Sequence, residues 1–171
     1  VLRLVADGIR GVKLHPDHQE FFVDDAAMMP VYRALAEAGL LLLFHAGVDI
    51  GIPPPVHCTA ERLARVLDAV PELTVIAAHM GGYLQWEAVE QFLIGRDLYL
   101  DASYSLADMG PDALVRLARA HGIERVLFGT DSPWTDQATE LAAFRVLPLS
   151  EEEKAALLGG NAQRLLGLST R

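Results

Sequence analysis

Five short apolar runs of strand length recur along the chain, at residues 11–14, 40–45, 73–79, 98–101 and 125–131. The second and third runs are apolar almost throughout, which is typical of strands that are buried on both faces. Parallel strands covered by helices produce this pattern. The runs therefore predict a sheet of five buried, parallel strands.

Helix signals fill the intervals between and after these runs. Asp24 or Asp25 stands where it could cap a helix that ends at Gly39. Thr59 stands where it could cap a second helix, and apolar residues at helical spacing follow it. Further helices are predicted over 85–94 and 111–122, from about 137, from 150 with a capping box at 150–153, and from about 161.

The alternation of strands and helices indicates a single α/β domain over residues 1–171 with a parallel sheet. An ionisable residue ends each run, and successive ones lie 22 to 34 residues apart. A (β/α)8 barrel of roughly 250 residues uses about 31 residues per unit. We therefore expect a TIM barrel of which this chain holds about five βα units. The missing N-terminal units, about 90 residues, would precede Val1, and the chain would be the C-terminal part.

An open, doubly wound sheet of five strands is the alternative, and the length of the chain suits it. Such folds usually bind phosphate at a glycine-rich first turn. Neither GxGxxG nor GxxxxGK[ST] occurs in the sequence. The ionisable residues at the ends of the runs favour the barrel, because barrel enzymes carry their chemistry there. The order of the strands in the sheet distinguishes the two folds.

Composition narrows the class of protein. Hydrophobic residues make up 51% and charged residues 22% of the chain, as in a globular domain. The net charge of −9 argues against a nucleic-acid partner, and no apolar run is long enough to span a membrane. A single cysteine excludes an internal disulfide framework. We expect a cytoplasmic protein with a small-molecule substrate, and a homo-oligomer because such barrels often pair through their outer helices.

Two histidines and an aspartate end runs that are far apart in the sequence. In a parallel α/β fold the carboxyl ends of all strands open on one face, so His45, His79 and Asp131 should converge there. Two imidazoles and a carboxylate suit Zn, Mn or Fe(II). The alternative is that each histidine is a hydrogen-bonded core residue and that Asp131 stabilises the following turn. The repetition at equivalent strand ends favours a metal site.

Other residues at the same face are candidates for substrate contacts. Lys13 could hold an anionic substrate or, if carboxylated, bridge two metals, or it could simply end an edge strand. His15 and His18 form an HxxH, a weak metal signal, and substrate contact or solvent exposure is the preferred interpretation. Trp134 could floor a pocket, whereas Tyr83 is expected to pack against a helix. Cys58 is disfavoured as a nucleophile because nothing indicates a lowered thiol pKa.

Five motifs in order resemble the amidohydrolase-related metal-dependent hydrolases, in the branch with aminocarboxymuconate-semialdehyde and resorcylate decarboxylases. They are Gly-Val-Lys-Leu-His-Pro (11–16), Phe-His-Ala-Gly (44–47), Ala-His-Met-Gly-Gly (78–82), Leu-Phe-Gly-Thr-Asp-Ser-Pro-Trp (127–134) and Gly-Asn-Ala-Gln-Arg-Leu-Leu (160–166). The resemblance implies a (β/α)8 barrel. It implies that His45 and Asp131 are metal ligands, and that His79 is a second-metal ligand or a catalytic histidine. It aligns Lys13 with a lysine that is carboxylated in some members.

One feature departs from the family pattern. The family takes further metal ligands from a His-x-His at the end of its first strand, and these 171 residues contain none. That strand would lie before Val1, so these residues alone are expected to hold part of the metal site and to be inactive.

The sequence thus predicts a metal-dependent hydrolase that acts on a small organic substrate through a metal-activated water. Zn is the expected cofactor, with Mn as the alternative. Asp131 would be the general base with assistance from His79, and Lys13, His15 and Trp134 would contact the substrate. The first alternative is non-oxidative decarboxylation of a small aromatic or unsaturated acid. The second is a truncated or degenerate barrel that serves as a binding module.

Overall fold

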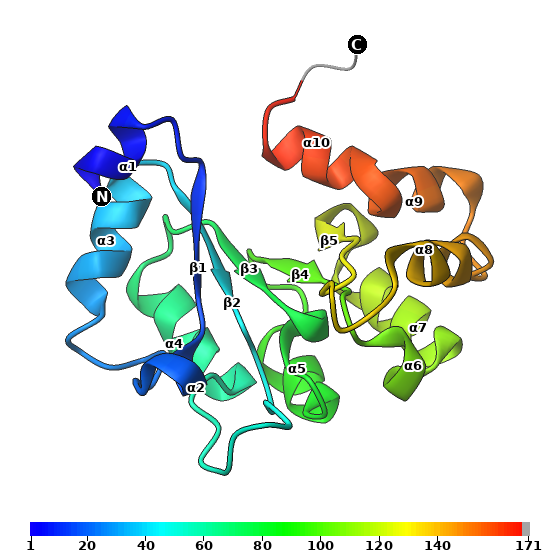
Figure 1. The fold of residues 1–171 in the computed structure, drawn as a ribbon, viewed down its shortest axis with the longest axis horizontal. Coiled ribbons are helices and arrows are strands. Elements are labelled where there is room, and N and C mark those ends of the chain that lie inside the picture. Colours follow the sequence, from blue (N-terminus) through cyan, green and yellow to red (C-terminus); the bar gives the residue numbers. More distant parts are fainter. Residues whose placement is uncertain (169–171) are drawn as a thin grey trace.

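A computed structural model describes residues 1–168, in which five parallel strands form one sheet (Figure 1). The strands are β1 (Gly11–Leu14), β2 (Leu41–Phe44), β3 (Val75–Ala77), β4 (Tyr99–Asp101) and β5 (Val126–Leu127). Each strand pairs with the next one along the chain, in the order β1-β2-β3-β4-β5. A doubly wound sheet would instead reverse its strand order at a switch point. The expectation of a partial (β/α)8 barrel is therefore confirmed, and the open sheet is excluded.

Helices connect the strands and extend the chain after β5 (Figure 1). They are α1 (Leu2–Ala6), α2 (Pro16–Gln19), α3 (Met29–Glu37), α4 (Ala60–Ala69), α5 (Trp86–Phe92), α6 (Leu106–Met109), α7 (Pro111–His121), α8 (Gln137–Arg145), α9 (Glu151–Ala155) and α10 (Asn161–Leu165). Every long helix that the sequence predicts is present, and α1, α2 and α6 are additional short ones.

Two predicted caps are confirmed and one is wrong. The Thr59 hydroxyl accepts a hydrogen bond from the Arg62 N–H at the start of α4, and Ser150 forms a capping box at the start of α9. The helix assigned to Asp24 or Asp25 begins only at Met29. The two carboxylates have other partners, because Asp25 accepts from the Phe22 N–H and Asp24 pairs with Arg62 and Arg65 on α4.

The core lies between the sheet and the helices that cover it. Leu42, Phe44 and Val75 of the sheet and Leu63 of α4 are fully buried. The Tyr32 ring meets the Phe44 ring edge-on at 5.6 Å between centroids, so α3 is fixed against β2. This packing explains the absence of polar alternation in the central strands, since both of their faces are covered.

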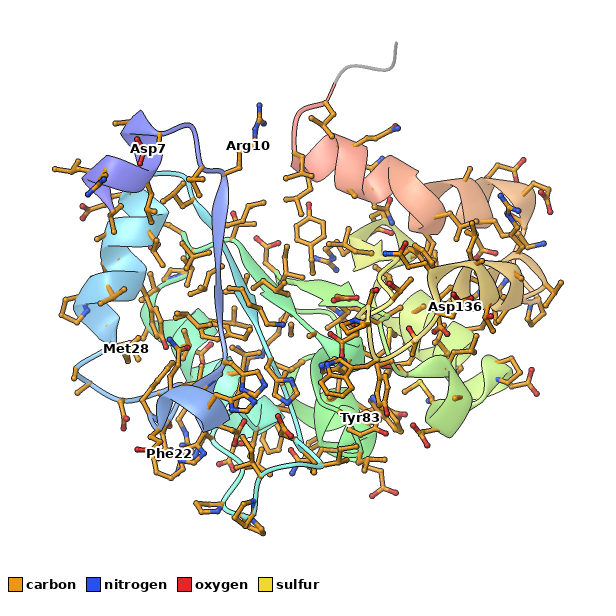
Figure 2. The ribbon with its side chains drawn as sticks, viewed as in Figure 1. Asp7, Arg10, Phe22, Met28, Tyr83 and Asp136 are labelled. Atoms are coloured by element: carbon orange, nitrogen blue, oxygen red, sulfur yellow. The ribbon has the colours of Figure 1, made fainter. Side chains whose placement is uncertain are left out.

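The C-terminal segment covers the amino end of the sheet. Arg10, just before β1, donates to the carbonyl of Leu166, and Leu165 lines grooves beside the residues that precede β2, β3 and β4. Arg10 and Tyr83 lie at opposite ends of the sheet (Figure 2). The carboxyl end, where Tyr83 lies, is therefore left for a functional site.

Within residues 1–168 the sheet has two edges, because β1 pairs only with β2 and β5 only with β4. The first and last strands therefore each have a single strand partner in this part of the chain. Over the same residues, no helix combines the length and the apolar character needed to cross a membrane.

Asn161 fixes α10 to β5, and its removal should destabilise the chain. Its buried side-chain amide donates to the carbonyls of Ile123 and Val126, each at 2.7 Å. The Asn161→Ala variant leaves both carbonyls without these donors, so we expect the free energy of unfolding to fall by about 2 kcal/mol. Urea unfolding measures this change. The exposed neighbour Gln163→Ala is the control, and an equal effect in both variants would contradict the assigned role.

Candidate metal and acid–base site

A cavity of about 490 Å³ opens at the carboxyl end of the sheet. Its lining includes all of the site residues that the sequence predicts, namely Lys13, His15, His45, His79, Asp131 and Trp134. They come from β1 and from the loops that follow β1, β2, β3 and β5. The parallel sheet brings them together because every strand delivers its carboxyl end to the same face.

A chain of two hydrogen bonds fixes the protons of the two buried histidines. His79 Nδ1 lies 3.0 Å from the Ser103 carbonyl oxygen, and His79 Nε2 lies 3.1 Å from His45 Nδ1. A carbonyl oxygen can only accept, so His79 Nδ1 carries a hydrogen and, in a neutral ring, His79 Nε2 is an acceptor. His45 Nδ1 must therefore donate to it, which leaves a lone pair on His45 Nε2.

His45 Nε2 is the unsatisfied atom of this arrangement. It is buried and has no hydrogen-bond partner within residues 1–168. Burial, which is the largest cause, and the neighbouring His79, His15 and Lys13 together lower the pKa of His45 to about 3. His45 is thus neutral near pH 7, which is the state in which imidazole binds a metal ion. An unpartnered, unprotonated and buried nitrogen is suited to such an ion.

Three residues that line the cavity have left-handed backbone conformations. The φ angles are 58° for His79, 52° for Tyr104 and 53° for Asp131. Each such residue costs on the order of 1–3 kcal/mol, and such outliers concentrate at functional sites. Trp86 supports the turn at His79 by donating its indole N–H to the His79 carbonyl at 3.1 Å.

Gly47 locks the loop after β2 against the loop after β3. A Cβ atom at this position would lie 2.1 Å from the Tyr83 nitrogen, and the φ angle is +86°. The close approach permits three backbone hydrogen bonds, from Tyr83 N to Ala46 O, from Val48 N to Tyr83 O and from Gly47 N to Cys58 O. Tyr83 and the loop that carries Asp49 are therefore held in register beside the cavity.

Tyr83 does not pack solely against a helix, as the sequence analysis expected, but lines the cavity. Its hydroxyl donates to the Asp108 carboxylate at 2.7 Å, and burial together with this bond raises the pKa of Tyr83 to about 12. The Tyr104 ring lies 5.5 Å from it, between centroids. Tyr104 and Asp49 also line the cavity, and the sequence patterns did not predict them there. The sequence feature that could have indicated both residues is their position, because each follows the end of a strand by a few residues.

Lys13 places a cationic group on β1 beside two carboxylates. Burial lowers the pKa of Lys13, and the charges of Asp101 and Asp131 oppose this shift. Burial raises the pKa of Asp101, against the effect of the hydrogen bonds from the Ser103 N–H at 2.8 Å and the Ser103 hydroxyl at 3.1 Å. Asp101 thereby holds the residue whose carbonyl orients His79. It is a positioning residue for the histidine pair.

Trp134 and Cys58 differ in their access to the cavity. Trp134 lies at the cavity mouth and its surface is 76% exposed, so it is free to cover a bound molecule. Cys58 is fully buried, and burial raises the pKa of its thiol. A thiolate is therefore disfavoured at Cys58, in line with its rejection as a nucleophile.

The proton state of His45 should make the stability of metal-free protein depend on pH. The folded chain holds the pKa of His45 at about 3, and the ordinary value is 6.5. Between these values the unfolded chain binds the proton, so stability is present above pH 6.5 and is lost as the pH falls towards 3. The free energy of unfolding should fall by at most about 1.4 kcal/mol per pH unit from this group.

The measurement is urea unfolding of chelator-treated protein between about pH 7 and about pH 4, a window that lies between the two pKa values. The His45→Gln variant should show a flatter dependence on pH because it lacks the imidazole. The same slope in both proteins would show that His45 does not contribute.

Solved structures share this fold. An uncharacterised TIM-barrel protein from Bordetella bronchiseptica has a TM-score of 0.81 at 26% identity, over 97% of this chain and 60% of its own. 5-Carboxyvanillate decarboxylase from Sphingomonas paucimobilis has a TM-score of 0.75 at 21% identity, over 98% of this chain and 62% of its own. A dihydroxybenzoic acid decarboxylase from Polaromonas has a TM-score of 0.76 at 21% identity, over 99% of this chain and 64% of its own. Its structure contains manganese and the inhibitor 2-nitroresorcinol. The chain thus spans about three fifths of the length of these structures.

The sequence comparisons give one match. No curated protein matches the chain in sequence. The sequence profile of a family described as amidohydrolase matches residues 2–168, which is nearly the whole chain and includes every residue of the cavity. This match confirms the resemblance carried by the five motifs. The chain belongs to the amidohydrolase family.

Proposed function

We propose that this chain binds a divalent metal ion through His45 and Asp131 and acts with it in the hydrolysis of a small organic acid. The observation that carries the proposal is the unpartnered, buried Nε2 of a neutral His45 in the same cavity as the Asp131 carboxylate. An imidazole and a carboxylate suit Zn and Mn. The amidohydrolase family, and the manganese in the Polaromonas decarboxylase, support a divalent ion.

The metal would supply Lewis-acid chemistry, polarising a substrate oxygen and lowering the pKa of water. The chain's own residues would handle the protons. Asp131 is the general base that takes the proton of the attacking water. His79 Nε2 accepts from His45 Nδ1, so His79 would take up a proton there only as that bond opens, with its Nδ1 hydrogen still bonded to the Ser103 carbonyl. The resulting cation would stabilise negative charge that develops beside it.

The cavity suits a substrate with an acidic group and an apolar body. The Lys13 ammonium is the cation that would bind the acidic group, with His15 beside it on the same wall. Tyr104 and Trp134 offer aromatic faces to the rest of the molecule. A volume of about 490 Å³ lies within the range of small-molecule sites, about 300–1,000 Å³.

Decarboxylation of a small aromatic acid is the second candidate, and the combination of Lys13 with aromatic walls favours it. In that reaction Lys13 would hold the carboxylate, and His79 or Asp131 would deliver the proton that replaces it. The relatives named as decarboxylases share the fold. A non-enzymatic binding module would use the same cavity for binding without turnover.

Loss of either proposed ligand should lower the metal content. After reconstitution with Zn or Mn, elemental analysis of His45→Ala and of Asp131→Ala should each find one equivalent less than in the unaltered protein. Asp112→Asn, an exposed carboxylate on α7, is the control and should keep the full content. Full metal content in both ligand variants would overturn the assignment.

His79 should affect turnover directly, beyond its effect on the proposed metal ligand His45. In metal-saturated protein that carries the complete metal site, we expect His79→Asn to lower kcat by about 10²- to 10⁴-fold, because it removes a group that holds a proton in the reaction. A panel of carboxylate-bearing lactones, esters and amides in ¹⁸O-water tests hydrolysis, and CO₂ release from aromatic acids tests decarboxylation. An unchanged kcat contradicts the role of His79. Ligand binding with no turnover in either assay would favour the binding module.

A further inference from the structure

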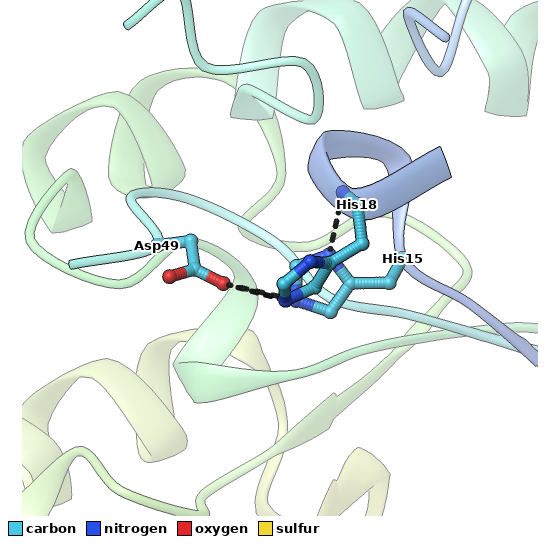
Figure 3. A group of neighbouring side chains, drawn as sticks. All are labelled: His15, His18 and Asp49. Carbon is cyan, nitrogen blue, oxygen red and sulfur yellow. Dashed lines mark hydrogen bonds and ion pairs between the residues drawn. The ribbon is translucent and has the colours of Figure 1, made fainter. Parts of the chain in front are cut away.

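We propose that His15, His18 and Asp49 form a second divalent-metal site at the mouth of the cavity, separate from the pair of His45 and Asp131. The three side chains converge from the loop after β1, from α2 and from the loop after β2 (Figure 3). The set comprises two imidazoles and one carboxylate. Catalytic zinc sites use such a set, and non-haem iron sites use a related one.

Two of the three distances among these groups match those around a tetrahedral ion. His15 Nε2 lies 3.2 Å and His18 Nε2 lies 3.5 Å from the same oxygen, Oδ2 of Asp49. The three potential ligand atoms all lie within 4.8 Å of one another. Ligands about 2.0–2.2 Å from a tetrahedral ion are about 3.3–3.6 Å apart. The side chains are therefore close to coordinating positions.

Local structure holds each ligand in place. His15 and His18 are three residues apart at the start of α2, so their side chains reach the same side. The Gly51 N–H donates to Asp49 Oδ1 at 2.8 Å, which leaves Oδ2 for the histidines. The Gln19 side chain accepts from the His15 N–H at 2.7 Å and fixes that end of the turn. The site is thus built by a loop, a short helix and a second loop that the sheet brings together.

Metal binding requires one rearrangement of protons. His15 Nδ1 now accepts from the His18 N–H at 3.4 Å, which is long for a hydrogen bond. Coordination through Nε2 places the ring hydrogen on Nδ1 and breaks this contact. Binding replaces this weak hydrogen bond and the direct contacts of both Nε2 atoms with Asp49 by three ligand bonds. The tautomer of His15 therefore reports on metal binding.

Access to the site differs from access to His45. The His18 side chain is 64% exposed, whereas those of His15 and Asp49 are 24% and 17% exposed. An ion can enter from solvent, and the positions left open by three ligands can take water or a substrate oxygen. The His15 ring stacks on the His45 ring with 4.0 Å between centroids, so the two sites are neighbours without sharing a ligand.

Metal titration tests the proposal. Metal-free protein is titrated with Co²⁺ and followed by visible absorption, and with Zn²⁺ and followed by calorimetry. We expect His18→Ala and Asp49→Asn each to remove one equivalent of bound ion and its Co²⁺ absorption band. Asp112→Asn is the matched control and should bind as the unaltered protein does. Equal stoichiometry in the unaltered protein and in both site variants would overturn the proposal.

A variant that lacks a ligand of the His45 site distinguishes the two metal sites. Asp131→Ala removes a proposed ligand of the His45 site and leaves His15, His18 and Asp49 in place. It should still bind one ion, and the double variant with His18→Ala should bind none. If Asp131→Ala binds no ion, or if ¹⁵N spectra show that the hydrogen of His15 stays on Nε2 in saturating Zn²⁺, the second site does not exist. Circular dichroism verifies that each variant is folded.

Discussion

The hydrogen bond between His45 Nδ1 and His79 Nε2 is the interaction on which the rest of the site depends. While His79 is neutral this bond has one possible direction, because the other nitrogen of His79 faces the Ser103 carbonyl, which can only accept. Ser103 is held in turn by Asp101, through both its N–H and its hydroxyl. A carboxylate at the end of β4 thus determines which nitrogen of a histidine after β2 is free.

This arrangement requires strained backbone conformations and close packing, and the close packing occurs at glycines. A Cβ atom on Gly129 would lie 2.4 Å from Asp101 Oδ1, so the segment after β5 can pass the positioning carboxylate only as glycine. Gly47 has the same role between the loops after β2 and β3. The rigid parts of the site are therefore its strand ends and the loop that Gly47 holds beside Tyr83, whereas Trp134 is exposed to solvent.

The sheet and the cavity lining could be predicted because they depend on short-range patterns. A strand that is apolar throughout is buried on both faces, and parallel strands share a carboxyl end, so His45, His79 and Asp131 had to meet. The start of α3 could not be predicted, because Asp24 does not cap this helix but forms an ion pair with Arg62, which is remote in sequence. The position of Tyr83 likewise depends on its contact with Asp108 across two loops. Contacts of this kind leave no periodicity in the sequence.

Charge balance connects the cavity to cations. Asp49 and Asp131 line the cavity and Asp101 lies behind it, whereas Lys13 is the only ammonium or guanidinium group among the described residues of the lining. Carboxylates held away from water need compensating charge, and His45 cannot supply it because burial lowers its pKa to about 3. The raised pKa of Asp101 favours its neutral form and so relieves part of the excess negative charge. A divalent ion at the proposed site would relieve the remainder and would also satisfy His45 Nε2. Electrostatics and the direction of one hydrogen bond thus favour the same occupant.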